Sequence, residues 1–239
     1  MTEAESADGS IAAEEARSFD RLVNFTDAVV AIAITLQLLP LATIKGPGEG
    51  QTVVDVFSEN SGTIFTFLLS FVIVVVMWIN HNRIFNVLRR ADGTILWLNI
   101  AWLVSIAFLP WPTAMYGDAT NQTAQQVGGI ALLYWSNLAV ISLILTLIAW
   151  HAARRPDLLA PGAASRGWLA DRKRSRLRGI VFPAWFIVIG LACEFFTPQA
   201  SWLALGLIPI GRWLNHRPKV SSASDPRPSG TPPTGSPPS

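Results

Sequence analysis

The chain has 239 residues, of which 51% are hydrophobic and only 14% charged, with a net charge of +2 and a mean hydropathy of +0.38. A soluble domain could not bury this much apolar surface, so the composition argues against a soluble fold and predicts an all-α integral membrane protein. The single cysteine, Cys193, excludes an intrachain disulfide and a cysteine-based metal cluster. Residues 1–20 are acidic and lack an apolar core, which predicts a solvated cytoplasmic arm rather than a secretory signal.

Six apolar segments follow along the chain, separated by charged or turn-rich connections: 22–44, 62–80, 94–115, 127–150, 179–196 and 200–214. Most are near the roughly 20 residues that cross the hydrocarbon of a bilayer. The sixth is short and contains two glycines and a proline, and it follows the fifth after a three-residue turn, so these two are predicted to form a tight hairpin. We therefore expect a six-helix membrane domain over 21–215 and a disordered Pro- and Ser-rich tail over 216–239.

The basic residues predict the orientation in the membrane. If both ends of the chain are cytoplasmic, 17 of the 18 basic residues lie in cytoplasmic segments and only Lys45 lies outside, as the positive-inside rule describes. Eight of them fall in the loop 154–178, which could hold the topology or rest on anionic membrane lipids. The chain has 15 arginines and 3 lysines, which is typical of a GC-rich bacterial genome and predicts a bacterial plasma membrane.

The first segment has a stripe of apolar and hydroxyl side chains along one side. At 100° per residue, its members lie within about 60° of one line: Phe25, Ala28, Ile32, Thr35, Leu36 and Leu39. Such a stripe could meet lipid or a neighbouring helix, or it could line a pore. In a pore, a ring of isoleucine or leucine can close the path by dewetting, and threonine hydroxyls can partly replace an ion's hydration shell.

Charged side chains lie at the start of this helix. Inserting an unpaired charge into the membrane costs about 2.5–3.5 kcal/mol. Asp27 lies about 140° from Ile32, so it points away from the stripe. In the expected topology His81, Asn99 and an indole N–H are level with Asp27 and could donate to its carboxylate. Arg21 lies only about 20° from the Ile32 line and could face a pore vestibule or turn back to Asp27. We interpret the cluster as an anchor for the helix.

Together these residues resemble one family. Arg21, Phe25, Thr26 and Asp27 are similar to the Arg-x-x-x-Phe-Ser-Asp signature of the transmembrane protein 175 family, with threonine where serine is usual. The similarity continues in three further runs, at 78–85 with Trp78 and His81, at 96–99 with Trp97 and Asn99, and at 108–114. The family comprises endolysosomal potassium channels and their bacterial homologues, and a single six-span unit resembles the bacterial form.

The resemblance implies a homotetramer in which four copies of the first helix surround a central pore. Ile32 then falls at the family's apolar gate, and Thr35 at a hydroxyl layer implicated in potassium preference. Leu36 and Leu39 would extend the narrow section outward. Potassium ions would pass along the pore without a fixed metal site or a cofactor. The family lacks the carbonyl filter of common potassium channels, as does this sequence, so we expect modest selectivity.

A passive, potassium-preferring cation channel is therefore the favoured function. The alternative is a proton-coupled or secondary cation transporter using Asp27, His81 and Glu194, but the cluster lies at one membrane face and no inverted repeat is visible. Glu194 is otherwise expected to be an interfacial carboxylate, and His151 to be solvated. An enzyme is disfavoured because the sequence has no Ser/His/Asp triad order, no His-x-x-x-His metal-binding pair and no Gly-rich phosphate-binding loop. Nothing indicates a nucleic-acid partner.

Overall fold

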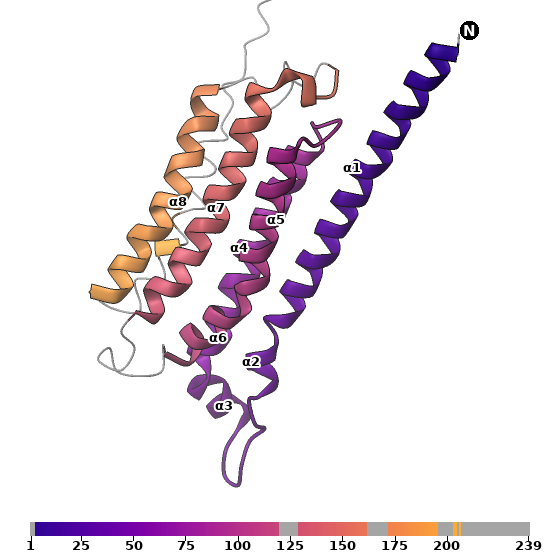
Figure 1. Cartoon of the computed structure of the whole chain (residues 1–239). Coiled ribbons are helices and arrows are strands. Elements are labelled where there is room, and N and C mark those ends of the chain that lie inside the picture. Colours follow the sequence, from indigo (N-terminus) through magenta and orange to yellow (C-terminus); the bar gives the residue numbers. More distant parts are fainter. Residues whose placement is uncertain (1–2, 120–128, 162–171, 196–202, 205, 207–239) are drawn as a thin grey trace, which may run out of the picture.

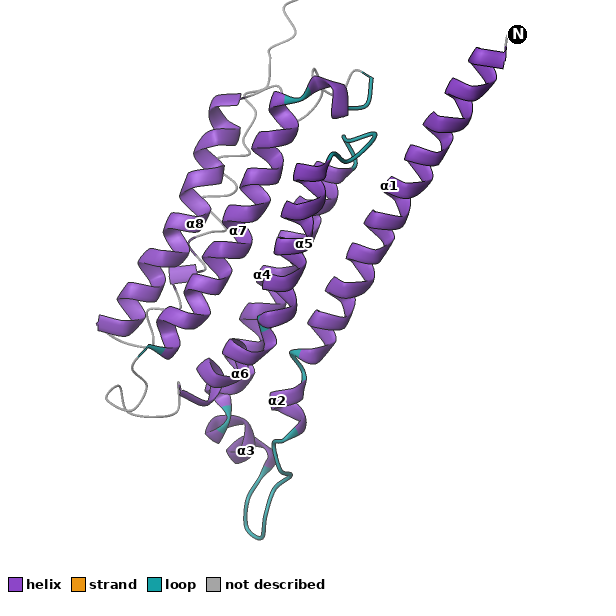
Figure 2. Ribbon diagram, in the orientation of Figure 1, coloured by secondary structure: helices purple, strands orange, loops and turns teal. Residues whose placement is uncertain are grey.

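The computed structural model is all-helical over the residues that it describes, 3–119, 129–161, 172–195, 203, 204 and 206 (Figure 1). In chain order the elements are α1 (Glu3–Leu36), α2 (Leu39–Ala42), α3 (Val53–Glu59), α4 (Ser61–Phe85), α5 (Gly93–Phe108), α6 (Pro110–Ala119), α7 (Ile130–Arg154), the 3₁₀ turn η2 (Pro156–Leu158) and α8 (Arg172–Phe195). Figure 2 shows that short loops join most of them.

Four of the described helical stretches are long and apolar enough to cross a membrane: Ala13–Ala42, Ser61–Phe85, Gly93–Ala119 and Ile130–Arg154. They correspond to the first four predicted segments. The fifth corresponds to a shorter apolar helix, Gly179–Phe195. The sixth predicted segment, 200–214, falls almost wholly outside the described residues, and the predicted tail falls entirely outside them.

The first helix is longer at its start and shorter at its end than the sequence predicts. It already begins at Glu3, because the residues before the membrane segment are rich in alanine and glutamate, which favour helix. Most of the predicted arm is therefore part of α1. The helix ends at Leu36 because Pro40 lacks the N–H that would bond the Leu36 carbonyl. Pro40 instead lies in the first turn of α2, which begins at Leu39 and where no such donor is needed.

The long helices lie side by side, with α1 along one edge of the bundle and α8 along the other (Figure 1). Close approach between α7 and α8 depends on small residues, as in other membrane helix pairs. A Cβ at Gly190 would lie 2.9 Å from the Cβ of Trp135, so only glycine fits there without a shift. The third predicted segment is divided into α5 and α6 at Pro110, which cannot continue the hydrogen-bond ladder.

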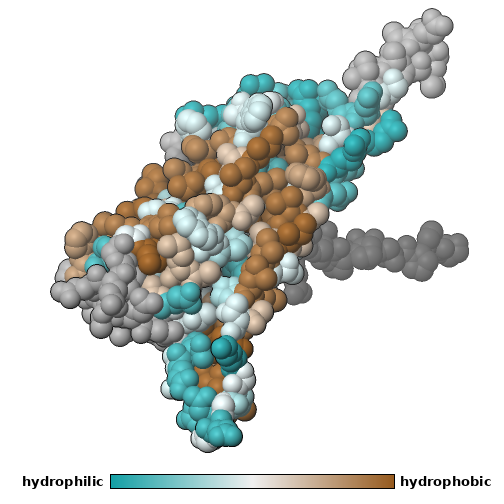
Figure 3. Space-filling model, turned by 60° about the horizontal axis from the view of Figure 1, so that its bottom comes forward, coloured by the Kyte–Doolittle hydropathy of each residue, from teal (hydrophilic) through white to brown (hydrophobic). Residues whose placement is uncertain are grey.

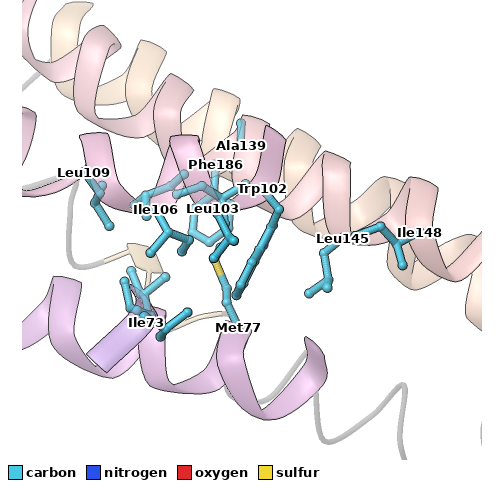
Figure 4. Packing of buried hydrophobic residues seen from close by; sticks show 14 of the residues in the cluster. Ile73, Met77, Trp102, Leu103, Ile106, Leu109, Ala139, Leu145, Ile148 and Phe186 are labelled. Carbon is cyan, nitrogen blue, oxygen red and sulfur yellow. The ribbon is translucent and has the colours of Figure 1, made fainter. Parts of the chain in front are cut away.

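The apolar core lies between α4, α5, α7 and α8. Figure 4 shows Ile73 and Met77 of α4 facing Trp102 and Ile106 of α5. These side chains are buried, and Trp102 is fully so. Many large apolar side chains are also exposed on the outside of the bundle. On the face that Figure 3 shows, brown predominates across the middle and teal towards the projecting ends. That pattern is the one expected of a protein whose middle faces lipid.

Charged groups join the loops at the end of the bundle where α4 and α7 terminate. Arg90 lies 3.4 Å from Asp157 and 3.7 Å from Glu15 of α1, while Lys45 belongs to the loop at the opposite end. His151, expected to be solvated, is instead half-buried, with its Nε2 2.7 Å from Asp92 because α7 ends beside the start of α5. Burial would raise the pKa of Asp92, but hydrogen bonds with His151 and the Ile95 N–H lower it below its usual range.

Glu194, expected to be an interfacial carboxylate, is half-buried at the end of α8. Its Oε1 accepts a hydrogen bond from the Gly129 N–H at 2.8 Å, just before α7 begins. An anion is stabilised at a helix amino terminus, where backbone donors are unpaired and the helix dipole is positive. Glu194 therefore fastens the end of α8 to the start of α7, and its role in the described structure is to hold two helices together.

Candidate functional site

Helix α1 packs one face against the other helices of the same chain and leaves the opposite face uncovered. Its buried positions recur every three or four residues at Thr26, Val30 and Ala33, and they face the neighbouring helices; Gln37, just after the helix ends, continues the pattern. The predicted stripe lies on the roughly opposite side. Its larger members are all exposed in the single chain: Phe25 by 60%, Ile32 by 59%, Leu36 by 41% and Leu39 by 60%. The apolar stripe is therefore available to another copy, to lipid or to a conduction path.

Thr35 interrupts this apolar stripe with a hydroxyl whose hydrogen is already used. Its Oγ1 donates to the Ile32 carbonyl of the same helix at 2.8 Å, and the side chain is exposed. A hydroxyl has one hydrogen and two lone pairs, so this bond leaves only acceptor capacity on the oxygen. On the uncovered side of α1, Thr35 thus offers a ligand suited to a cation.

A buried polar network holds the opposite face of α1. The Trp78 Nε1 of α4 donates to the Asp27 carboxylate at 2.8 Å. The Asn99 Nδ2 of α5 donates to the Thr26 hydroxyl, also at 2.8 Å. The expected indole donor to Asp27 is therefore Trp78, whereas His81 and Asn99, which were also expected as donors, do not bond Asp27. The reason is geometric: Thr26 and Asp27 point about 100° apart on the helix, so each meets a different neighbour.

The direction of the network is fixed by its members. The Thr26 hydroxyl donates to the Leu22 carbonyl at 2.9 Å, so its oxygen accepts from the Asn99 amide. The Asn99 Oδ1 is then the acceptor for His81, 2.8 Å away, which places a hydrogen on the His81 Nε2. Thr26, His81 and Asn99 are fully buried. These bonds join α1, α4 and α5 without water-exposed links.

Aromatic rings that were not predicted as part of the site extend this network. The His81 ring stacks between Phe85 and Trp102, with centroid distances of 4.0 and 4.5 Å. Phe19 of α1 stacks on the far side of Phe85 at 5.9 Å. The i, i+4 spacing of His81 and Phe85 is a signal that could have indicated a shared helix face. The stack packs α1 against the same two helices that hold its polar residues.

Three of the predicted anchor residues lie elsewhere. Phe25 belongs to the exposed stripe, and Trp97 is 71% exposed because it lies about 200° around α5 from Asn99. Arg21 is exposed and forms no hydrogen bond or ion pair with any described residue. The described part of the chain also contains no group of three or more His, Cys, Asp or Glu residues that could hold a metal ion. The anchor is therefore formed by Thr26, Asp27, Trp78, His81 and Asn99.

The sequence of this region is similar to that of known proteins. Residues 21–110 match a family described as the endosomal/lysosomal potassium channel TMEM175. A potassium channel from Chamaesiphon minutus is 31% identical over 201 residues, covering 82% of this chain and 93% of that protein. One from Streptomyces collinus is 29% identical over 199 residues, covering 83% and 93%. The human endosomal/lysosomal proton channel TMEM175 is 29% identical over 82% of this chain, which spans only 38% of the human protein.

A solved structure shares the fold. The crystal structure of a lysosomal potassium-selective channel TMEM175 homolog from Chamaesiphon minutus superposes with a TM-score of 0.65 and 26% sequence identity. The match covers 84% of this chain and 100% of that chain. The arrangement of the helices around the polar network is thus that of a known channel fold.

The network predicts a difference between two substitutions of Thr26. Thr26→Val keeps the branched shape but removes the hydroxyl, so the buried Asn99 amide loses its acceptor. We expect a loss of about 1–3 kcal/mol in the free energy of unfolding. Thr26→Ser keeps the hydroxyl and should remain close to wild type. Thermal unfolding of the purified protein in detergent measures both, and equal melting temperatures for the two variants would contradict the assigned bond.

Proposed function

This chain belongs to the TMEM175 family, whose members are ion channels and not enzymes, and we propose that it is a potassium-preferring cation channel that conducts passively. The observation that best supports this proposal is the uncovered face of α1, where an acceptor-only hydroxyl lies within an apolar stripe. One copy of α1 cannot enclose a path. We therefore propose a homotetramer in which four α1 stripes face a common axis.

The stripe supplies the two parts that such a path needs. Ile32 would close it, because a narrow apolar ring excludes water and an ion cannot cross a dry segment without its hydration shell. Thr35 would provide a layer of four hydroxyl oxygens one turn beyond the gate. Leu36 and Leu39 would keep the path narrow on the far side of that layer.

The polar network lies on the side of α1 opposite Ile32 and holds the helix in place. It fixes α1 against α4 and α5 through the Trp78–Asp27 and Asn99–Thr26 bonds. A gate formed by one side chain per subunit depends on how that helix is rotated, and two bonds in different directions limit rotation. The network members therefore position the gate and take no part in conduction.

The charged ends support an orientation in the membrane. Arginines of the α4–α5 loop and of the end of α7 lie at one end of the bundle, and Lys45 lies at the other. By the positive-inside rule we propose that the arginine end, with both chain termini, is cytoplasmic. Residues 21–215 would then form the channel domain in contact with membrane lipids, and 1–20 and 216–239 its cytoplasmic extensions.

Electrical recording from the purified protein in planar bilayers tests the function. A channel gives unitary current steps, and a reversal potential between potassium and sodium solutions that favours potassium. A proton-coupled or secondary transporter gives slow flux without such steps. Mass measurement in detergent tests the oligomer, and a strictly monomeric particle would exclude the shared path.

The gate assignment predicts that Ile32→Ala raises basal current. The smaller side chain widens the apolar ring, so water enters more readily and the closed state becomes less favourable. Ile34→Ala is the matched control, because Ile34 is on the same helix but packs against the core of its own subunit. Open probability in single-channel recordings measures the effect. Equal basal currents in Ile32→Ala and wild type would remove Ile32 from the gate.

The hydroxyl layer predicts a separate change in selectivity. Thr35→Val has almost the same shape but no oxygen, so a partly dehydrated potassium ion loses up to four ligands. We expect the potassium-to-sodium permeability ratio to fall in Thr35→Val and to be largely kept in Thr35→Ser. Reversal potentials under bi-ionic conditions give this ratio. An unchanged ratio in the valine variant would show that selectivity arises elsewhere.

A further inference from the structure

The charge of Arg21 is not compensated within the described chain. Its side chain is exposed and has no hydrogen-bond or ion-pair partner among the described residues. Asp27, which could have been its partner, accepts instead from the Trp78 indole. Because a guanidinium stays protonated at any physiological pH, each subunit keeps a free positive charge at this position.

Arg21 also lies on the line of the proposed gate. Helix α1 is unbroken from Glu3 to Leu36, so angles can be followed along its whole length. Arg21 lies within about 20° of Ile32 and about 16 Å nearer the amino terminus. Figure 1 shows the first turns of α1 standing clear of the other helices. The surface that Ile32 faces is therefore the surface that Arg21 faces.

Nearby acids do not cancel this charge within one subunit. Asp20 points about 100° away from Arg21 around the helix, and Glu15 is engaged with Arg90 at 3.7 Å. Glu14 is on the Arg21 line but about 10 Å further from the gate. Arg17, one turn away and about 40° to the side, adds further positive charge. Positive charge therefore dominates the stripe at the level of Arg21.

We propose that four Arg21 side chains form a ring of positive charge at one mouth of the pore and make the channel conduct cations unequally in the two directions. This inference depends on the proposed function. A positive ring lowers the local concentration of cations that enter from its side, whereas cations entering from the other side reach the gate first. Screening lengths are about 10 Å at 0.1 M salt and about 3 Å at 1 M, so the asymmetry should fade in concentrated salt.

Single-channel currents of the full chain in planar bilayers test the ring. The readout is the ratio of the larger to the smaller current at equal and opposite voltages, which does not depend on how the protein inserts. In symmetric KCl we expect a wild-type ratio of about two to five at about 0.1 M and near one at about 1 M. Arg21→Gln should lower the ratio at about 0.1 M towards one and leave it near one at about 1 M, and Arg21→Lys should keep the wild-type behaviour.

Arg83→Gln is the matched control. It also removes one positive charge per subunit at the same end of the bundle, but from the exposed side of α4, outside the proposed path. It should keep the wild-type ratio. If Arg83→Gln changes the current ratio as much as Arg21→Gln does, or if neither variant changes it, the proposed Arg21 ring is contradicted.

Chemical modification tests the charge without relying on one variant. Arg21→Cys can be treated with a positively or a negatively charged methanethiosulfonate, and wild type is the control because Cys193 is buried. Each reagent is added to one side of the bilayer only, so that the reacting mouth is known. The positive reagent should make the cation current that enters from that side the smaller of the two, and the negative reagent should make it the larger. If the channel gives unitary currents whose asymmetry does not depend on the charge at position 21, only this inference is contradicted. A wild-type protein without unitary currents overturns the proposed function as well.

Discussion

A polar group inside hydrocarbon must find its partner within the protein, and this constraint sets the rotation of α1. Thr26 and Asp27 are adjacent in sequence and point about 100° apart, towards two different helices. Asn99 of α5 donates to the first and Trp78 of α4 to the second, each at 2.8 Å. Two bonds at one level, in two directions, leave one rotation of α1 in which both groups are satisfied.

Apolar packing alone would not select this rotation. All sides of α1 within the membrane segment are largely apolar, and lipid is as apolar as leucine, so exchanging Val30 for Ile32 at the helix interface changes little hydrophobic free energy. A rotation by one residue step, however, would leave the Asp27 carboxylate without the Trp78 donor and the Asn99 Nδ2 without the Thr26 acceptor, at about 1–3 kcal/mol for each group. The polar residues on one side of α1 thus determine which apolar residues are left uncovered on the other.

Local patterns predicted the membrane segments better than the contacts between them. Length and hydropathy are local properties, and they were sufficient to identify the first four spans. The residues that share a network also emerged from their common level in the membrane. Their pairing emerged only in part, because it depends on how two helices are rotated relative to each other. The expected indole N–H does donate to Asp27, from Trp78, but His81 and Asn99 join Thr26 rather than Asp27, and Trp97 faces outward. The burial of His151 was not predicted either. Its partner Asp92 lies 59 residues away in the sequence and reaches it only through the packing of α5 against α7.

Two threonines of α1 show how the same local chemistry leads to different roles. Thr26 and Thr35 both donate their hydroxyl hydrogen to a carbonyl of the preceding turn, at 2.9 and 2.8 Å, and both are left with acceptor capacity only. Thr26 faces inward, where Asn99 satisfies it. Thr35 faces the uncovered side, where no described residue donates to its oxygen. Its lone pairs can accept from water or coordinate a cation, so the chemistry of Thr35 is compatible with the proposed aqueous path.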